Sequence, residues 1–135
     1  MRLLNKVAFI TGGGRGIGRE IALAFAREGA DVGVAARTLA EVEAVAKEVQ
    51  ALGRRGLALR LDLSDRANVR QTARKVLDHF GRVDILVNNA GVLPKGPVQS
   101  LDEQTWDSTL AINLTGMFLI TQSFLGQMLE RGWGR

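Results

Sequence analysis

A short stretch near the start of the chain is crowded with glycines, and its residue types suit the binding of a phosphate group. It runs from Thr11 to Gly18, after an apolar run at 6–10 and before apolar residues that recur at helical spacing as far as Gly29. Glycine lets the backbone turn tightly and approach a ligand closely. A helix start also presents unpaired N–H groups, which favour an anion. The stretch therefore predicts a phosphate-binding turn, with a plain strand-to-helix connection as the alternative.

Polar residues stand directly after three further apolar runs. Arg37 follows the run 31–36, Asp62 follows 56–61, and the pair Asn88-Asn89 follows 83–87. In an open parallel sheet, ligands bind in the crevice outside the carboxyl ends of the strands. If these runs are parallel strands, their polar residues and the glycine stretch gather at one edge and form a single site.

The spacing of apolar residues predicts the elements that would hold this site. Strands are expected at 6–10, 31–36, 56–61 and 83–87, and helices between about 17 and 29, 38 and 53, 65 and 81, and 103 and 131. Thr38 with Glu41, and Ser100 with Glu103, match the capping-box pattern of a helix start. Four alternating βα units indicate an α/β, Rossmann-type, doubly wound parallel sheet in one domain over residues 1–135, with strand order 3-2-1-4.

Composition restricts the classes of function. The chain has 135 residues, 46% of them hydrophobic, and a net charge of +4. Its arginines are scattered and it has no tyrosine, so nucleic-acid binding is not expected. No apolar run is seen to approach the roughly 20 residues that span a bilayer, so no membrane partner is expected. The absence of cysteine removes disulfides and thiolate metal sites, no metal site is predicted, and a cytoplasmic location is the simplest expectation.

Together these motifs resemble the short-chain dehydrogenase/reductase family, and most of all its beta-ketoacyl-ACP reductase-like members. The resemblance rests on the pattern from Thr11 to Gly18, on Asp62, on the run from Asn88 to Gly91, and on Asn113 in the last helix. It extends over about 6–135. The resemblance implies oxidation of an alcohol or reduction of a carbonyl, by hydride transfer with a nicotinamide cofactor.

The resemblance also implies roles for individual residues. Those expected to bind the cofactor are Gly12, Gly14, Arg15, Gly16, Ile17, Gly18, Arg37, Asp62, Leu63, Asn88, Ala90 and Gly91. The asparagine pair would also brace the sheet. Alternatives remain open, because Asp62 could simply begin a turn and the asparagines could form a strand-end turn.

The end of the second strand indicates which cofactor is preferred. A site selective for NAD(H) places an acidic residue there to bind the ribose 2′-hydroxyl. Here Ala36 is followed by Arg37, and Arg15 lies inside the glycine stretch. Guanidinium groups bind phosphate through paired hydrogen bonds, so we expect NADP(H) rather than NAD(H). The alternative is that both arginines are solvated surface residues.

Catalysis in the resembled family comes from serine, tyrosine and lysine beyond the fourth βα unit. This sequence contains no tyrosine, and Asn113 is the one catalytic residue carried over, with a proposed part in proton relay. Asn113 could instead bond a backbone carbonyl. We therefore expect the cofactor-binding half of the fold, inactive by itself, which meets a carbonyl or alcohol substrate only with a complementary C-terminal segment.

Two further expectations concern assembly and the alternative functions. The apolar residues of the helix over 103–131 predict a homo-oligomer formed through that helix. If catalysis is not the role, the alternatives are a stand-alone nucleotide-binding module or an interaction module.

Overall fold

The computed structural model describes residues 1–135, and a four-stranded parallel sheet forms its centre. The strands are β1 (Val7–Thr11), β2 (Asp31–Ala36), β3 (Gly56–Arg60) and β4 (Ile85–Val87). Their order is β3-β2-β1-β4, with every pairing parallel, so the predicted order is confirmed. The chain reverses its direction of winding at β1, which opens a crevice between the carboxyl ends of β1 and β4.

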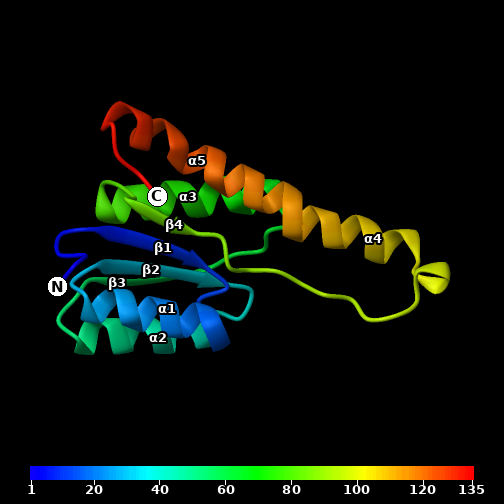
Figure 1. Ribbon diagram of the computed structural model, residues 1–135, viewed down its shortest axis with the longest axis horizontal. Coiled ribbons are helices and arrows are strands. Elements are labelled where there is room, and N and C mark those ends of the chain that lie inside the picture. The colour runs from blue at the N-terminus through cyan, green and yellow to red at the C-terminus, as the bar shows by residue number, and fades with distance from the viewer.

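Helices cover both faces of the sheet (Figure 1). On one face lie α1 (Gly16–Arg27) and α2 (Leu39–Ala51), and on the other α3 (Arg66–Phe80) and α5 (Met117–Glu130). A shorter helix, α4 (Glu103–Leu110), extends beyond the carboxyl ends of the strands. This is the doubly wound α/β arrangement that the sequence predicts.

The two layers of core follow from the alternation of side chains along β1. Ala8 and Ile10 belong to the core beneath α1 and α2, whereas Val7 and Phe9 belong to the core beneath α3 and α5. Phe9 meets Phe124 of α5 edge to face, with ring centroids 5.5 Å apart. Because successive residues of a strand face opposite sides, one apolar run serves both cores.

Helix α4 begins where predicted, but its N-cap differs from the prediction. Asp102 is the N-cap, and its carboxylate accepts a hydrogen bond of 2.6 Å from the Thr105 amide. The Ser100–Glu103 capping box does not form, because Ser100 belongs to a separate 3₁₀ turn, Val98–Ser100. Serine and aspartate are both good N-caps. The sequence pattern therefore placed the cap two residues too early.

A π-helical segment, Ala111–Gly116, joins α4 to α5 without a break. The continuous helix, Glu103–Glu130, has 28 residues and is long and apolar enough to cross a membrane. The expectation that no apolar stretch has this length is therefore wrong. Leu119, Ile120 and Phe124 of this helix are buried in the core beside α3.

After α5 the chain makes an ordered turn. The amides of Gly132 and Trp133 donate to the carbonyls of Leu129 and Met128, and Gly132 has a φ of 66°. Arg135 then lies beside β4: its amide donates to the carbonyl of Asp84, 3.0 Å away, and its carbonyl accepts from the amide of Leu86, 2.9 Å away. The chain thus returns after α5 to the edge of the sheet beside β4.

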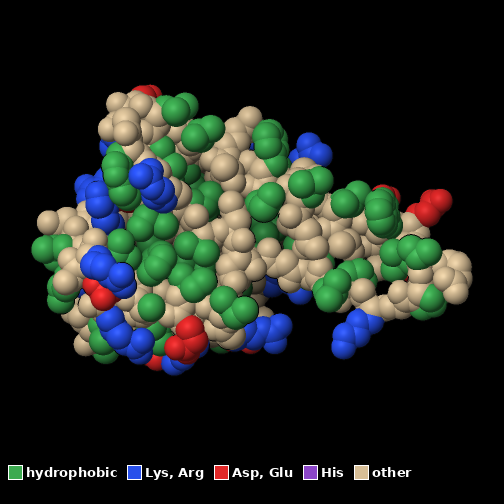
Figure 2. Space-filling model, in the orientation of Figure 1, with side chains coloured by type: hydrophobic (Ala, Val, Ile, Leu, Met, Phe, Trp, Pro, Cys, Tyr) green, Lys and Arg blue, Asp and Glu red, His purple; other side chains and the backbone are tan.

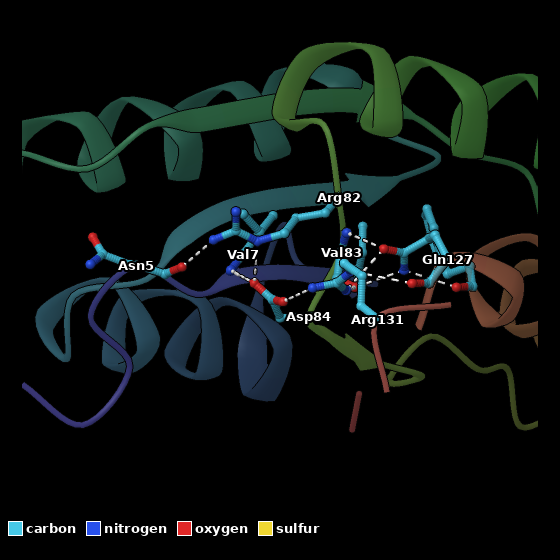
Figure 3. Close-up of polar contacts among 8 residues, drawn as sticks. Asn5, Val7, Arg82, Val83, Asp84, Gln127 and Arg131 are labelled. Carbon is cyan, nitrogen blue, oxygen red and sulfur yellow. Dashed lines mark hydrogen bonds and ion pairs between the residues drawn. The ribbon is translucent and has the colours of Figure 1, made fainter. Parts of the chain in front are cut away.

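The amino end of β4 carries a buried ion-pair network built around Asp84 (Figure 3). One carboxylate oxygen accepts from the Val7 amide at 2.8 Å and from Arg82 Nε at 3.0 Å, and the other accepts from Arg131 at 2.7 Å. Gln127 of α5 pairs with the backbone of Val83 beside it. The network joins β1, β4 and the end of α5.

Burial alone would raise the pKa of Asp84. Hydrogen bonds from Arg131, from the Val7 amide and from Arg82 outweigh that effect, and the pKa lies below its ordinary value. Asp84 is therefore a carboxylate at neutral pH, and each of its oxygens has a donor.

Candidate functional site

A groove of about 420 Å³ lies at the carboxyl ends of the strands. Its walls are the glycine stretch, the ends of β2 and β3, the chain after β4, and the first turn of α2. It brings together eleven of the twelve residues predicted to bind cofactor: Gly12, Gly14, Arg15, Gly16, Ile17, Gly18, Arg37, Asp62, Leu63, Ala90 and Gly91. These eleven residues, the first and last of which are 79 positions apart in the sequence, thus line one cavity, as the strand order requires.

The glycine stretch forms the floor of this groove by close backbone packing. A Cβ atom at Gly18 would lie 2.2 Å from the Gly12 carbonyl oxygen and 2.5 Å from Asn89 Nδ2, so only glycine fits there. Helix α1 begins at Gly16 with no side chain capping its first turn. The N–H groups of that turn therefore remain available to an anion, at the positive end of the helix dipole.

Asn89 and Thr11 brace the crevice between β1 and β4. The Asn89 side-chain amide donates to the carbonyls of Thr11, at 3.0 Å, and Gly12, at 3.1 Å. The Thr11 hydroxyl accepts from the amides of Asn89, at 3.2 Å, and Ala90, at 3.1 Å. These bonds fix the glycine stretch against the chain that follows β4.

Asn88 does not line the groove, contrary to the prediction. It is exposed, and its side-chain amide donates to the Thr121 hydroxyl of α5 at 3.1 Å. Successive residues in an extended chain face opposite sides, so Asn88 and Asn89 cannot both face the groove. That alternation could have indicated from the sequence that only one of the two asparagines lines the groove, although not which one.

Asp62 both lines the groove and begins a turn. One of its oxygens accepts from the Ser64 hydroxyl at 2.6 Å and from the Ser64 amide at 3.0 Å. The hydroxyl bond is the main cause of a lowered pKa for Asp62; the Ser64 amide and the charges of Arg37 and Arg60 add to it, whereas burial opposes it. The second carboxylate oxygen accepts no hydrogen bond from the protein and is available to a ligand.

Arg15 and Arg37 provide positive charge at the rim of the groove. Both side chains are exposed and line the cavity from different elements. Neither takes part in any of the seven salt bridges of the molecule. Two unpaired guanidinium groups beside one cavity form a suitable site for an anionic ligand.

Asn113 lies in the π-helical segment and holds the chain that follows β4. Its side-chain oxygen accepts from the Val92 amide at 2.8 Å, and its side-chain nitrogen donates to the Val92 carbonyl at 2.7 Å. The side chain therefore positions a neighbouring segment and does not line the groove. Its neighbour Ile112 does line the groove.

Comparisons with known proteins identify the family. A model of the family described as short chain dehydrogenase matches residues 6–135. The chain belongs to the short-chain dehydrogenase family. It is 42% identical over 135 residues to a (2S)-[(R)-hydroxy(phenyl)methyl]succinyl-CoA dehydrogenase subunit, BbsD, of Thauera aromatica, covering 100% of this chain and 54% of that protein. It is 39% identical over 132 residues to a 3-oxoacyl-[acyl-carrier-protein] reductase of Staphylococcus epidermidis, covering 97% and 54%.

Solved structures of short-chain dehydrogenases share this fold. A metagenomic short-chain oxidoreductase in complex with NADP has a TM-score of 0.94 at 36% identity, covering 99% of this chain and 61% of that one. An NAD⁺-bound xylitol dehydrogenase also has a TM-score of 0.94, at 29% identity, covering 100% and 52%. A nicotinamide cofactor is common to both. The chain spans about half the length of the curated relatives that it matches.

Proposed function

We propose that these 135 residues form the NADP(H)-binding part of a short-chain dehydrogenase that interconverts carbonyls and alcohols. The observation that carries this proposal is the pair of unpaired arginines, Arg15 and Arg37, at the rim of the groove. No acidic residue follows Ala36 directly at the end of β2. Arg15 and Arg37 would hold a 2′-phosphate, because each guanidinium group can offer it paired hydrogen bonds.

The groove fits a dinucleotide in other respects as well. The uncapped first turn of α1 supports binding of the pyrophosphate, because its N–H groups lack partners within the helix. The free oxygen of Asp62 can accept a hydrogen bond from the amino group of an adenine. We propose that Ala90 and Gly91 line the adenosine ribose side of the site.

When bound, the nicotinamide would supply the hydride that is exchanged with a carbonyl carbon. These residues bind and orient that cofactor in the proposal, whereas the 135 residues contain no tyrosine to supply the proton. We therefore propose that turnover needs groups from outside these residues, and that substrate choice lies with them. The part of Asn113 in proton relay remains a prediction; its contacts support a positioning role for the Val92 segment.

Titration of NADPH and NADH into the purified chain and its Arg37→Ala variant tests the cofactor proposal. Loss of a charged hydrogen-bond donor to phosphate should weaken NADPH binding by roughly 10-fold to 100-fold and leave NADH within about threefold. Arg27→Ala is the matched control, since Arg27 is exposed at the far end of α1 and forms no salt bridge. Equal losses for both nucleotides would contradict a 2′-phosphate site.

An exposed apolar surface supports the proposal of a homo-oligomer. Figure 2 shows apolar side chains gathered over α4 and the loop that precedes it. Trp106, Leu114 and Phe118 are each more than half exposed. Burial of this surface against a second copy of the chain would remove it from water, and the mass in solution, measured by sedimentation, tests this.

A cytoplasmic location is also proposed, because the chain contains no cysteine.

A further inference from the structure

The groove has a second acidic residue besides Asp62, and the family's cofactor chemistry does not account for it. Glu41, in the first turn of α2, lines the cavity together with Arg15 and Arg37. Its carboxylate accepts no hydrogen bond and forms no salt bridge, although the side chain is only partly exposed. Asp62 differs, because Ser64 already occupies one of its oxygens.

Packing holds Glu41 directly against the glycine stretch. A Cβ atom built on Gly14 would lie 2.9 Å from the Glu41 Cβ and 3.2 Å from its Oε2. The first turn of α2 therefore touches the phosphate-binding turn, and the carboxylate lies beside residue 14. Only the absence of a side chain at Gly14 leaves room for it there.

The sequence predicts a different use for this carboxylate. Thr38 and Glu41 match a capping box, in which the acidic side chain turns back to the start of its own helix. Helix α2 does begin after Thr38, but Thr38 makes no side-chain capping bond. The box is not formed, and the Glu41 carboxylate contacts the groove wall instead of the backbone amide of the helix start.

A fixed negative charge in this position acts differently on the two nicotinamide nucleotides. The ribose 2′-phosphate of NADP(H) carries a negative charge toward the arginine pair, whereas the 2′-hydroxyl of NAD(H) carries none. A nearby carboxylate repels the first and leaves the second almost unaffected. It can also accept a hydrogen bond from a hydroxyl, which a phosphate cannot donate when fully ionised.

We infer that Glu41 is a specificity-determining residue that offsets the arginine pair and narrows the preference of this groove for NADP(H) over NAD(H). The inference rests on the proposed function, because it assumes that the groove binds a nicotinamide nucleotide. It concerns the ratio of the two affinities and not the existence of binding, so the two ideas can fail separately.

The test is calorimetric titration of NADPH and NADH into wild type, Glu41→Gln and Glu43→Gln. Glu43 lies two positions along the same helix, is exposed and does not line the groove, so its variant makes the same charge change elsewhere. For Glu41→Gln we expect NADPH affinity to rise roughly 3-fold to 10-fold while NADH changes by less than about twofold. Glu41→Lys should change the ratio further in the same direction. Added salt should reduce both effects.

Each outcome is decisive. If Glu41→Gln and Glu43→Gln change the NADPH/NADH ratio equally, or if neither changes it, the inference is overturned while wild-type binding still supports the proposed function. If wild type binds neither nucleotide, the proposed function fails and the inference fails with it. Circular dichroism of each variant confirms that α2 remains folded during the titration.

Discussion

The two ends of the strand pair β1–β4 differ in whether all their polar groups have hydrogen-bond partners within the protein. At the amino end, the Asp84 carboxylate has donors on both oxygens, from Val7, Arg82 and Arg131 (Figure 3). At the carboxyl end, Thr11 and Asn89 bond to each other's segments, but the exposed Arg15 and the first turn of α1 lack such partners. Pairing satisfies the first region within the protein, whereas the second keeps its hydrogen-bonding capacity for a ligand.

This difference suggests that one end of the two strands serves the stability of the fold and the other serves ligand binding. A buried charge without partners would destabilise the fold, so Asp84 must be fully paired. The groove is open to water, which solvates its unpaired groups until a ligand replaces the water. Substitutions at the amino end should therefore change the free energy of unfolding, and those at the carboxyl end should change affinity.

The largest effect is expected for Gly18→Ala at the carboxyl end. The new Cβ would lie 2.2 Å from the Gly12 carbonyl oxygen, so the glycine stretch must move away from Asn89. We expect NADPH affinity to fall by about 100-fold or more, measured by calorimetry. Gly126→Ala is the control, because a Cβ there meets nothing within 4 Å. Retained affinity would show that the floor of the groove is not rigid.

Next in size is Asp84→Asn at the amino end, which leaves Arg131 and Arg82 without their carboxylate. Breaking a buried pair in this way should lower the free energy of unfolding by about 2–4 kcal/mol, measured by urea denaturation. Asp78→Asn is the matched control, on the exposed face of α3. A variant as stable as wild type would mean that the network adds no more than a surface ion pair.

The acid dependence of the same network should be a smaller effect. The pKa of Asp84 is lower in the folded state than its unfolded value of about 3.9, so its stabilisation is present above that pH. It is lost as the pH falls through the folded pKa. The difference in melting temperature between wild type and Asp84→Asn should therefore narrow below about pH 4. A constant difference from pH 6 down to about pH 2.5 would contradict this assignment.

Most of the fold could be predicted from local sequence patterns. The alternation of strands and helices determines the parallel sheet, and right-handed crossovers limit the strand order. The predicted helix over 103–131 is confirmed, and only its N-cap is misplaced, for a physical reason. Two residues near its start, Ser100 and Asp102, are both good caps, and packing decides between them. The π-helical segment was not predicted; Asn113, which lies in it, bonds to Val92, a residue far away in the sequence.

The location of the site at the carboxyl ends of the strands could be predicted from the sequence, but the direction of individual side chains could not. Glycines and polar residues at the carboxyl ends of the strands pointed to the groove that the fold assembles. Asn88 was misplaced because only the backbone after β4 determines which asparagine faces β1. Glu41 was read as a helix cap, since its contact with Gly14 joins elements 27 residues apart.

The π-helical segment also changes how the last helix must be read as a pattern. A single wide turn contains one residue more than an α-helical turn, so it rotates everything before it by about 100° relative to everything after it. Trp106 and Phe124 therefore belong to different angular phases, and they differ in exposure from 55% to 0%. The apolar faces of the two parts of this helix thus point in different directions. The face on α5 packs into the core beside α3, whereas the face on α4 lies beyond the sheet.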